Sequence, residues 1–269
     1  MRTGAVRRLE LEITLRRAIT HGELRLAYQP IVNLRTGRTD GVEALVRWQH
    51  PTEGLVMPAE FISVAEQSGL IVPLGEWVLI EACRQAHAWH AHPELAHLTM
   101  SVNLSRRQIA QTDIVSVVAN ILDNTKMVPA RLVLEITESE LMSDTAKSVA
   151  VLHDLKALGV GLSVDDFGTG YSSLSYLKKF PVDILKIDKS FIDGLGQDNE
   201  DSSIVGATIS LARSLHLTTI AEGAETAHQV HLFSELGCDK AQGYLFSRPQ
   251  FADDLIPHLL KSVQSLPMR

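Results

Sequence analysis

Two adjacent carboxylates, Asp165 and Asp166, are the residues of this chain whose type and spacing most clearly suggest chemistry. They follow the apolar run 160–164, which predicts a buried strand, and Gly168 and Gly170 punctuate the loop after them. Because neighbouring carboxylates repel each other and lose hydration in a closed site, either one holds a proton or a cation lies between them. A divalent metal ion is the commonest such cation. Another interpretation stays open at this point, in which Asp166 caps the next segment and Asp165 is solvated.

Other oxygen-bearing side chains stand where further strands are predicted to end. They are Glu43, Asn103, Glu135 and Glu222. A single residue of this kind is most often a solvated group at the rim of a sheet, but Glu43 and Glu135 lie inside apolar runs. Carboxylates that converge from several strands need cations, and oxygen ligands without His or Cys favour Mg²⁺ or Mn²⁺ over zinc. A carboxylate that bridges two ions, most easily Asp165, would make a two-metal site.

Lys186 lies inside an apolar strand predicted over residues 184–188. A lysine on such a strand, beside several carboxylates, is either an ion-pair partner or a group that handles protons. A structural salt bridge is the simpler interpretation. Beside a metal ion, the same lysine becomes a candidate to orient the attacking water or to accept its proton.

The elements that must position these side chains alternate between strands and helices. Residues 24–34 and 40–48 are predicted as strands that pair antiparallel across the short turn Thr36-Gly37. Six more strands are predicted over residues 98–104, 132–137, 160–164, 184–188, 218–221 and 239–245. Their alternation with helices implies a parallel sheet, and eight strands imply a closed (β/α)8 barrel, made irregular by its first hairpin. The site of such a barrel lies at the carboxyl ends of its strands.

Helices and one long loop complete the prediction. The helices are expected over residues 7–20, 58–69, 73–91, 113–124, 144–158, 174–179, 200–215, 224–236 and 251–265. Residues 50–58 are expected to form a loop. We divide the chain into a connector helix within residues 1–20, which would follow something upstream, and one barrel domain over residues 21–269.

Composition narrows the class of protein. The chain has 269 residues, of which 45% are hydrophobic and 21% charged, and its formal net charge is -7. This charge argues against binding polymeric nucleic acid, which favours a basic face. Cys83 and Cys238 are far apart and indicate reduced thiols in a cytoplasmic protein. The charged amino terminus lacks a signal peptide, and no apolar run reaches the roughly 18 residues of a membrane helix, so we expect no membrane contact.

Several motifs, in order, resemble the EAL family of cyclic di-GMP phosphodiesterases, which is named for Glu-Ala-Leu, here residues 43–45. The motifs are Tyr28-Gln29-Pro30-Ile31, residues 43–48, Ser101-Val102-Asn103-Leu104-Ser105, residues 134–139, 165–174, 185–188 and 221–226, and Gln242-Gly243-Tyr244. Together they span about residues 24–249. The one departure noticed is Ala224, where Val is usual, and we expect no loss of activity from it.

The resemblance implies a modified TIM (β/α)8 barrel whose first strand is antiparallel, and hydrolysis of cyclic di-GMP to linear pGpG with two Mg²⁺ or Mn²⁺ ions. It makes Glu43, Asn103, Glu135 and Asp165 ligands of one ion. It makes Asp165, Asp166 and Glu222 ligands of the second.

The resemblance also assigns roles around the metals. Lys186 would contact the attacking water, with Glu43 and Gln242 as further catalytic groups. Gln29, Arg47 and Gln242 would bind substrate, with Arg47 at a phosphate. Glu138 would anchor the loop over residues 167–173, which also bears on dimerisation, and Glu225 would fill a further supporting position.

Three classes of function are weighed. The first is an active cyclic di-GMP hydrolase, as a homodimer and with a possible upstream sensor or GGDEF-type domain. The second is a receptor that binds cyclic di-GMP without cleaving it; such proteins typically lose metal ligands or the loop motif, and all are present here. The third is another metal-dependent barrel enzyme in which Lys186 abstracts a proton, which the adjacent aspartates and the full motif set disfavour.

Overall fold

The computed structural model describes residues 2–111, 113–141, 145–168, 177–192, 194–195 and 199–262. Its elements, in chain order, are α1 (Arg2–His21), β1 (Leu24–Asn33), β2 (Thr39–His50), β3 (Gly54–Val56), α2 (Pro58–Ser68), α3 (Ile71–His90), β4 (Thr99–Asn103), α4 (Arg106–Ala110), α5 (Ile114–Thr125), the short 3₁₀ helix η1 (Pro129–Arg131), β5 (Leu132–Thr137), α6 (Glu138–Leu141), α7 (Thr145–Ala157), β6 (Gly161–Phe167), β7 (Ile184–Ile187), α9 (Lys189–Ile192), α10 (Asn199–Ser214), β8 (Thr218–Ala221), α11 (Ala227–Leu236), β9 (Lys240–Ala241), β10 (Gln250–Phe251) and α12 (Ala252–Ser262).

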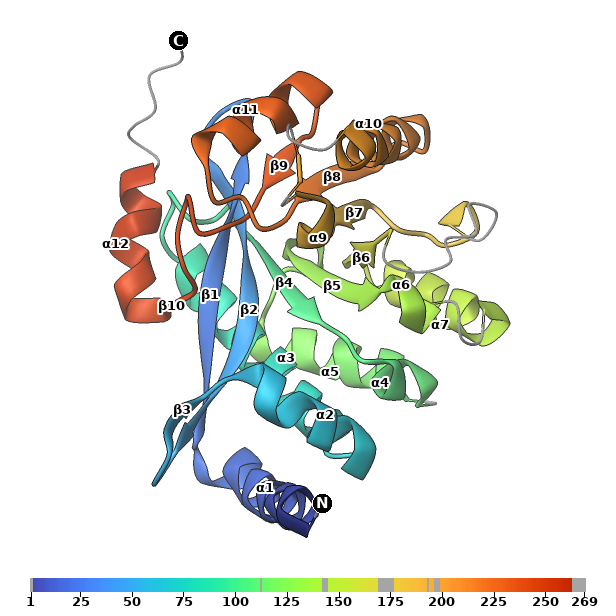
Figure 1. Cartoon of the computed structure of the whole chain (residues 1–269). Coiled ribbons are helices and arrows are strands. Elements are labelled where there is room, and N and C mark those ends of the chain that lie inside the picture. The colour runs from blue at the N-terminus through green and yellow to red at the C-terminus, as the bar shows by residue number, and fades with distance from the viewer. Residues whose placement is uncertain are drawn as a thin grey trace.

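The strands close into a barrel with helices around it (Figure 1). Neighbouring strands follow the order β1-β9-β8-β7-β6-β5-β4-β2, and a further pairing of β1 with β2 completes the circle. Strand β1 runs antiparallel to both β2 and β9, whereas the other barrel pairs are parallel. The two remaining strands lie outside the circle, β3 beside β2 and β10 beside β1. The structure therefore confirms the predicted modified TIM barrel with an antiparallel first strand.

Apolar strands, and helices that bury one apolar face, explain the packing. Five of the six residues of β5 are buried, as expected for a parallel strand covered on both faces. On α5, the buried residues Ile114, Val118, Ile121 and Leu122 recur at helical spacing and form one face. This face belongs to the large core cluster that also contains the barrel strands.

The β1–β2 pair extends beyond the rim formed by the carboxyl ends of the parallel strands. Ala44 of β2 still pairs with Val102 of β4, near the carboxyl end of β4, but β2 continues to His50. Over this extension β2 pairs only with β1 and β3, so that Leu24 meets Trp48. A second core cluster, formed by α1, α2 and the start of α3 around Trp48, covers the extension.

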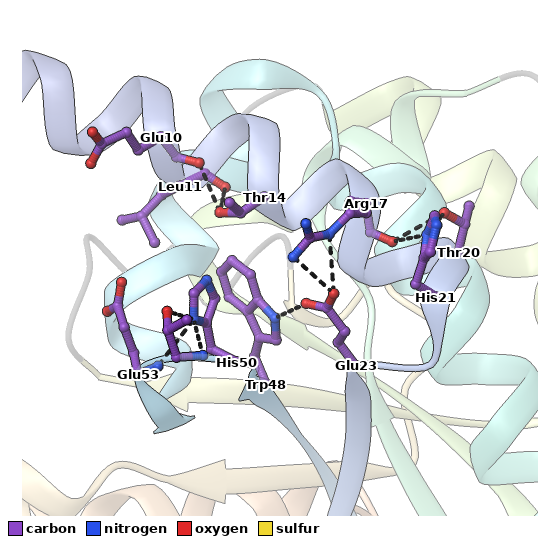
Figure 2. A network of polar contacts seen from close by, with 11 residues as sticks. Glu10, Leu11, Thr14, Arg17, Thr20, His21, Glu23, Trp48, His50 and Glu53 are labelled. Atoms are coloured by element: carbon purple, nitrogen blue, oxygen red, sulfur yellow. Dashed lines mark hydrogen bonds and ion pairs between the residues drawn. The ribbon is translucent and has the colours of Figure 1, made fainter.

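Polar contacts fix α1 to the residue before β1 and to the extension of β2 (Figure 2). Glu23 accepts hydrogen bonds from Arg17 Nε at 3.2 Å and from Trp48 Nε1 at 3.1 Å. At the other end of the helix, Arg7 pairs with Glu53. On the inner face of α1, Leu15 is fully buried. The helix predicted over residues 7–20 is therefore present as part of α1 and packs against β1, β2 and α2. Its role as a connector, and the division of the chain at residue 20, stay predictions.

Several element predictions need correction. Residues 50–58 are not all loop, because a turn after His50 leads into β3, which pairs antiparallel with β2. Helix α4 was not expected, although its Ser105 cap accepts a hydrogen bond from the Gln108 backbone. The strand predicted over residues 160–164 extends to Phe167, and the last predicted strand shrinks to β9. The first half of the helix predicted over residues 174–179, and the end of the one over residues 251–265, lie outside the described residues.

Within the described part of the chain, we find no helix with the combined length and apolarity that a membrane crossing requires.

Candidate active site

The barrel brings the predicted site residues to one rim. Glu43 lies in β2, Asn103 ends β4, Glu135 lies in β5, and both aspartates lie in β6. Glu222 and Gln242 directly follow β8 and β9. The parallel register places Asn103 opposite Glu135, whereas Asp165 lies opposite Thr137, two residues further along β5 than Glu135.

Lys186 is the centre of this arrangement. Its Nζ lies 2.6 Å from Glu222 Oε1, 2.7 Å from Glu135 Oε2, 3.2 Å from Asp165 Oδ1 and 3.5 Å from Glu43 Oε2. Only 1% of the residue is exposed. Burial opposes its charge, but the surrounding carboxylates outweigh burial and hold the pKa of Lys186 well above its usual value. The ammonium group is therefore charged at neutral pH.

Glu43 is held from both sides by amide groups. Asn103 Nδ2 donates to Glu43 Oε1 at 2.8 Å, and Gln242 Nε2 donates to Glu43 Oε2 at 2.8 Å. Gln242 also donates to Gln29 Oε1 at 3.0 Å, and Gln29 donates to the Ser247 carbonyl at 3.1 Å. Burial raises the pKa of Glu43, but Lys186 and these amides outweigh burial and lower it. Glu43 is therefore a fixed anion.

The other carboxyls titrate much higher than usual. Burial, reinforced by neighbouring anions, raises the pKa of Glu135 to about 8 and that of Glu222 to about 8, even with Lys186 beside them. Burial and the adjacent Asp165 raise the pKa of Asp166 to about 6. One ammonium group does not neutralise this many acids, so the site has an excess of negative charge that a cation would relieve.

The side chains present fit divalent ions. Asp165, Asp166 and Glu222 offer oxygen atoms that all lie within 4.8 Å of one another. Glu135 Oε1 and Gln242 Oε1 are buried without a hydrogen-bond partner among the described residues. Asp166 has a left-handed backbone with φ of 53°, and its N–H donates to Asp165 Oδ1 at 3.0 Å, which orients the adjacent acids. An all-oxygen set of this kind suits Mg²⁺ or Mn²⁺.

Two cavities adjoin the acids. One, of about 270 Å³, opens at the mouth of the barrel between Gln29, Glu43, Asp165, Glu222 and Gln242. The other, also of about 270 Å³, is mainly apolar and runs between β2, α2 and α3, with Asn103 and Glu135 in its wall. The acidic centre thus lies between a polar space and an apolar one.

The residues assigned to loop anchoring differ in what they contact. Glu138 is buried, and its Oε2 accepts a hydrogen bond from the Gly168 N–H at 2.9 Å. Residues 169–176 lie outside the described residues, and so does most of the loop that Glu138 is predicted to anchor. Glu225 instead pairs with Lys189, with 2.6 Å between Oε1 and Nζ. Its supporting role stays a prediction.

Arg47 is buried on β2, four residues after Glu43. Its Nη1 donates to the Val46 carbonyl at 2.8 Å, and burial lowers the pKa of its guanidinium group. A contact of Arg47 with phosphate stays a prediction. Lys189 and Tyr244 also line the mouth, and sequence reasoning gave neither of them a role. The signal was available, because Tyr244 belongs to the motif of residues 242–244 and Lys189 directly follows the motif of residues 185–188.

Comparison with known proteins agrees with this geometry. A family model described as the EAL domain matches residues 13–249. The chain is 46% identical over 260 residues to the bifunctional diguanylate cyclase/cyclic di-GMP phosphodiesterase MucR of Pseudomonas aeruginosa, which covers 95% of this chain and 37% of MucR. It is 42% identical over 245 residues to the cyclic di-GMP phosphodiesterase NbdA of the same organism, covering 91% of this chain and 31% of NbdA. The chain therefore spans about a third of the length of these relatives.

A solved structure of the PaMucR phosphodiesterase in complex with c-di-GMP has the same fold. Its TM-score against this chain is 0.88 at 46% sequence identity, and the match covers 92% of this chain and 100% of that one. The EAL enzyme Bd1971, in a form bound to cAMP and cyclic di-GMP, has a TM-score of 0.90 at 33% identity, with 95% of this chain and 70% of that chain covered.

Proposed function

The chain belongs to the EAL-domain family, and from that premise we propose that it hydrolyses one phosphodiester bond of cyclic di-GMP to give linear pGpG. The observation that supports this most is the acidic centre, in which carboxylates from neighbouring barrel strands converge on the buried ammonium group of Lys186. An intact set of acids argues for an enzyme rather than for a receptor that binds without cleavage.

We propose two Mg²⁺ or Mn²⁺ ions in this centre. Glu43, Asn103, Glu135 and Asp165 would hold one ion, and Asp165, Asp166 and Glu222 would hold the other. When bound, such ions supply positive charge to the phosphoryl oxygens and lower the pKa of a water molecule. The protein's own part is to present the oxygen ligands from rigid strands and to keep the acids apart in the absence of metal.

Lys186 acts in this proposal as a charged donor. In the metal-free centre the surrounding carboxylates hold the pKa of Lys186 above its usual value, and the ammonium group would orient the attacking water and the developing negative charge. Gln242, already bonded to Glu43 and Gln29, positions water or substrate on the opposite side. Gln29 and Arg47 would contact the substrate, and the apolar cavity beside Asn103 offers space for a nucleobase.

The remaining parts of the proposal concern the setting of the domain. The relatives extend well beyond the matched region, which supports an upstream sensor or GGDEF-type domain in the whole protein. We also propose a homodimer that acts in the cytoplasm, where it would lower the concentration of a bacterial second messenger.

The test is incubation of the chain with cyclic di-GMP and Mn²⁺, with and without EDTA, followed by chromatography of the products. We expect pGpG to accumulate only with free metal, and Asp165→Asn to abolish the product. Asp154→Asn, on the exposed side of α7, is the matched control and should retain full activity. Tight binding of cyclic di-GMP by the wild type without any pGpG would establish the receptor alternative instead.

A further inference from the structure

The mouth of the barrel is lined almost entirely by acids and neutral groups. Glu43, Asp165, Glu222 and Glu225 all reach the polar cavity. Lys186 lies beneath them and is nearly inaccessible. Among the described residues that line this cavity, Lys189 is the one cation. A ligand with two phosphates that enters this cavity therefore has Lys189 as the cation in its lining.

The backbone around Lys189 gives its side chain a defined path into the mouth. Lys189 begins α9, two residues after the end of β7. Its stem passes over Gly223, where an added Cβ atom would lie only 2.4 Å from Lys189 Cγ. Gly223 also has a φ of 70°, which L side chains rarely adopt. The absence of a side chain at this position therefore leaves room for the lysine.

Glu225 holds the ammonium group at the edge of the mouth. The Nζ and Oε1 atoms are 2.6 Å apart, and both side chains are 47% exposed. An ion pair as exposed as this contributes little, because water and salt screen it. A phosphate diester that carries a full charge and lies closer to the dry centre can therefore take over the ammonium group from Glu225.

We infer that Lys189 binds a phosphate of the cyclic dinucleotide, and that Glu225 competes with the substrate for it. This inference rests on the proposed function, because the ligand is the proposed substrate. A cyclic dinucleotide has two phosphodiesters, and the acidic centre with its ions engages the one that is cut. The other phosphodiester needs a positive partner at the mouth. Arg47, proposed above as a phosphate contact, is not among the residues that line this cavity, whereas Lys189 is.

The inference makes two predictions of opposite sign. Lys189→Met removes the cation, so KM for cyclic di-GMP should rise about tenfold, as expected for a lost charge-assisted hydrogen bond. Glu225→Gln removes the competitor, so KM should fall by roughly two- to fivefold, the range of an exposed ion pair. Lys189→Arg keeps the charge and should remain near the wild type. The dependence of KM on salt should be weaker in Lys189→Met.

Lys240 and Asp40 offer a matched control pair. They form an ion pair with 3.2 Å between Nζ and Oδ2, their side chains are 21% and 28% exposed, and neither residue lines the mouth cavity. Lys240→Met and Asp40→Asn should leave KM unchanged. The measurements are steady-state kinetics with Mg²⁺ over a range of salt concentrations, and isothermal titration of cyclic di-GMP.

The outcomes separate this inference from the proposed function. A wild-type KM in Lys189→Met would overturn the role of Lys189 while the hydrolase proposal stands. A lower kcat in Glu225→Gln, without any fall in KM, would overturn the competition and favour the loop-supporting role. If the wild type binds cyclic di-GMP without cleaving it, the same comparison is made on Kd. If it neither binds nor cleaves, both proposals are refuted.

Discussion

Metal binding to the acidic centre should release protons, and the number released should fall as pH rises. In the metal-free protein, burial holds the pKa of both Glu135 and Glu222 at about 8 and that of Asp166 at about 6. A carboxylate that binds metal must be deprotonated, so every proton that these groups still hold is expelled when the ions bind.

The magnitude follows from these pKa values. A carboxyl with a pKa of about 8 is roughly nine-tenths protonated at pH 7 and half protonated at pH 8. The two glutamates should therefore release about two protons at pH 7 and about one at pH 8. Because each released proton changes the affinity by up to about tenfold per pH unit, Mg²⁺ should bind roughly thirtyfold more tightly at pH 8 than at pH 7.

The same groups determine how the stability of the metal-free protein depends on pH. Their folded-state pKa values exceed the unfolded value of 4.5, so between that value and about pH 8 the folded chain holds more protons than the unfolded chain. These groups therefore make the metal-free protein less stable as pH rises through this window. Added Mg²⁺ should raise the melting temperature more at pH 8 than at pH 6.

Isothermal titration of Mg²⁺ in two buffers with different heats of ionisation measures the protons released. Glu222→Gln should lower the release at pH 7 by about one proton. Glu81→Gln, which removes a partner of Arg84 from an exposed ion pair on α3, should leave the release unchanged. No proton release by the wild type at pH 7 would show that both glutamates are already ionised, and would refute the reasoning.

Three substitutions test the remaining roles. Asp165→Ala should lower turnover by orders of magnitude in a chain whose circular dichroism shows a folded barrel, because the lost charge acts mainly in the transition state; near-normal turnover would refute the two-metal site. Lys186→Ala should slow kcat by roughly 10²–10⁴-fold at saturating metal, and normal kinetics per folded molecule, together with a lower melting temperature, would reduce Lys186 to a structural ion pair. Glu138→Ala removes the acceptor of the Gly168 N–H and should lower both activity and metal affinity in titrations; values equal to the wild type would refute coupling between the loop and the metals.

The fold was largely predictable because most barrel strands are mainly apolar and end at, or directly before, a polar residue. Leu132–Thr137 and Thr218–Ala221 were predicted with their observed bounds. The predictions failed where pairing, rather than local pattern, decides the structure. Gly54–Val56 is a strand because it pairs with the extension of β2, and only two residues of the predicted strand 239–245 are paired with neighbours.

For the site, the sequence supplied the types of residue but not their partners. The strand-end rule correctly places Glu43, Glu135 and Glu222 together, but their distances from Lys186 depend on barrel closure. The ion pair of Glu225 with Lys189 joins two different strand-end loops, and no local pattern in either segment indicates it. The metal ligation that the family resemblance implies for these residues stays a prediction.

The reversed direction of β1 decides from which side the chain enters the barrel. In a barrel whose strands are all parallel, the first strand starts at the face opposite the site. Here Leu24 starts β1 opposite Trp48, beyond the catalytic rim, and α1 lies on that side as well. A domain joined ahead of α1 in a longer polypeptide would therefore begin on the substrate's side. Glu23 and Trp48 join α1 to β2, so α1 is connected to Glu43 through a single barrel strand.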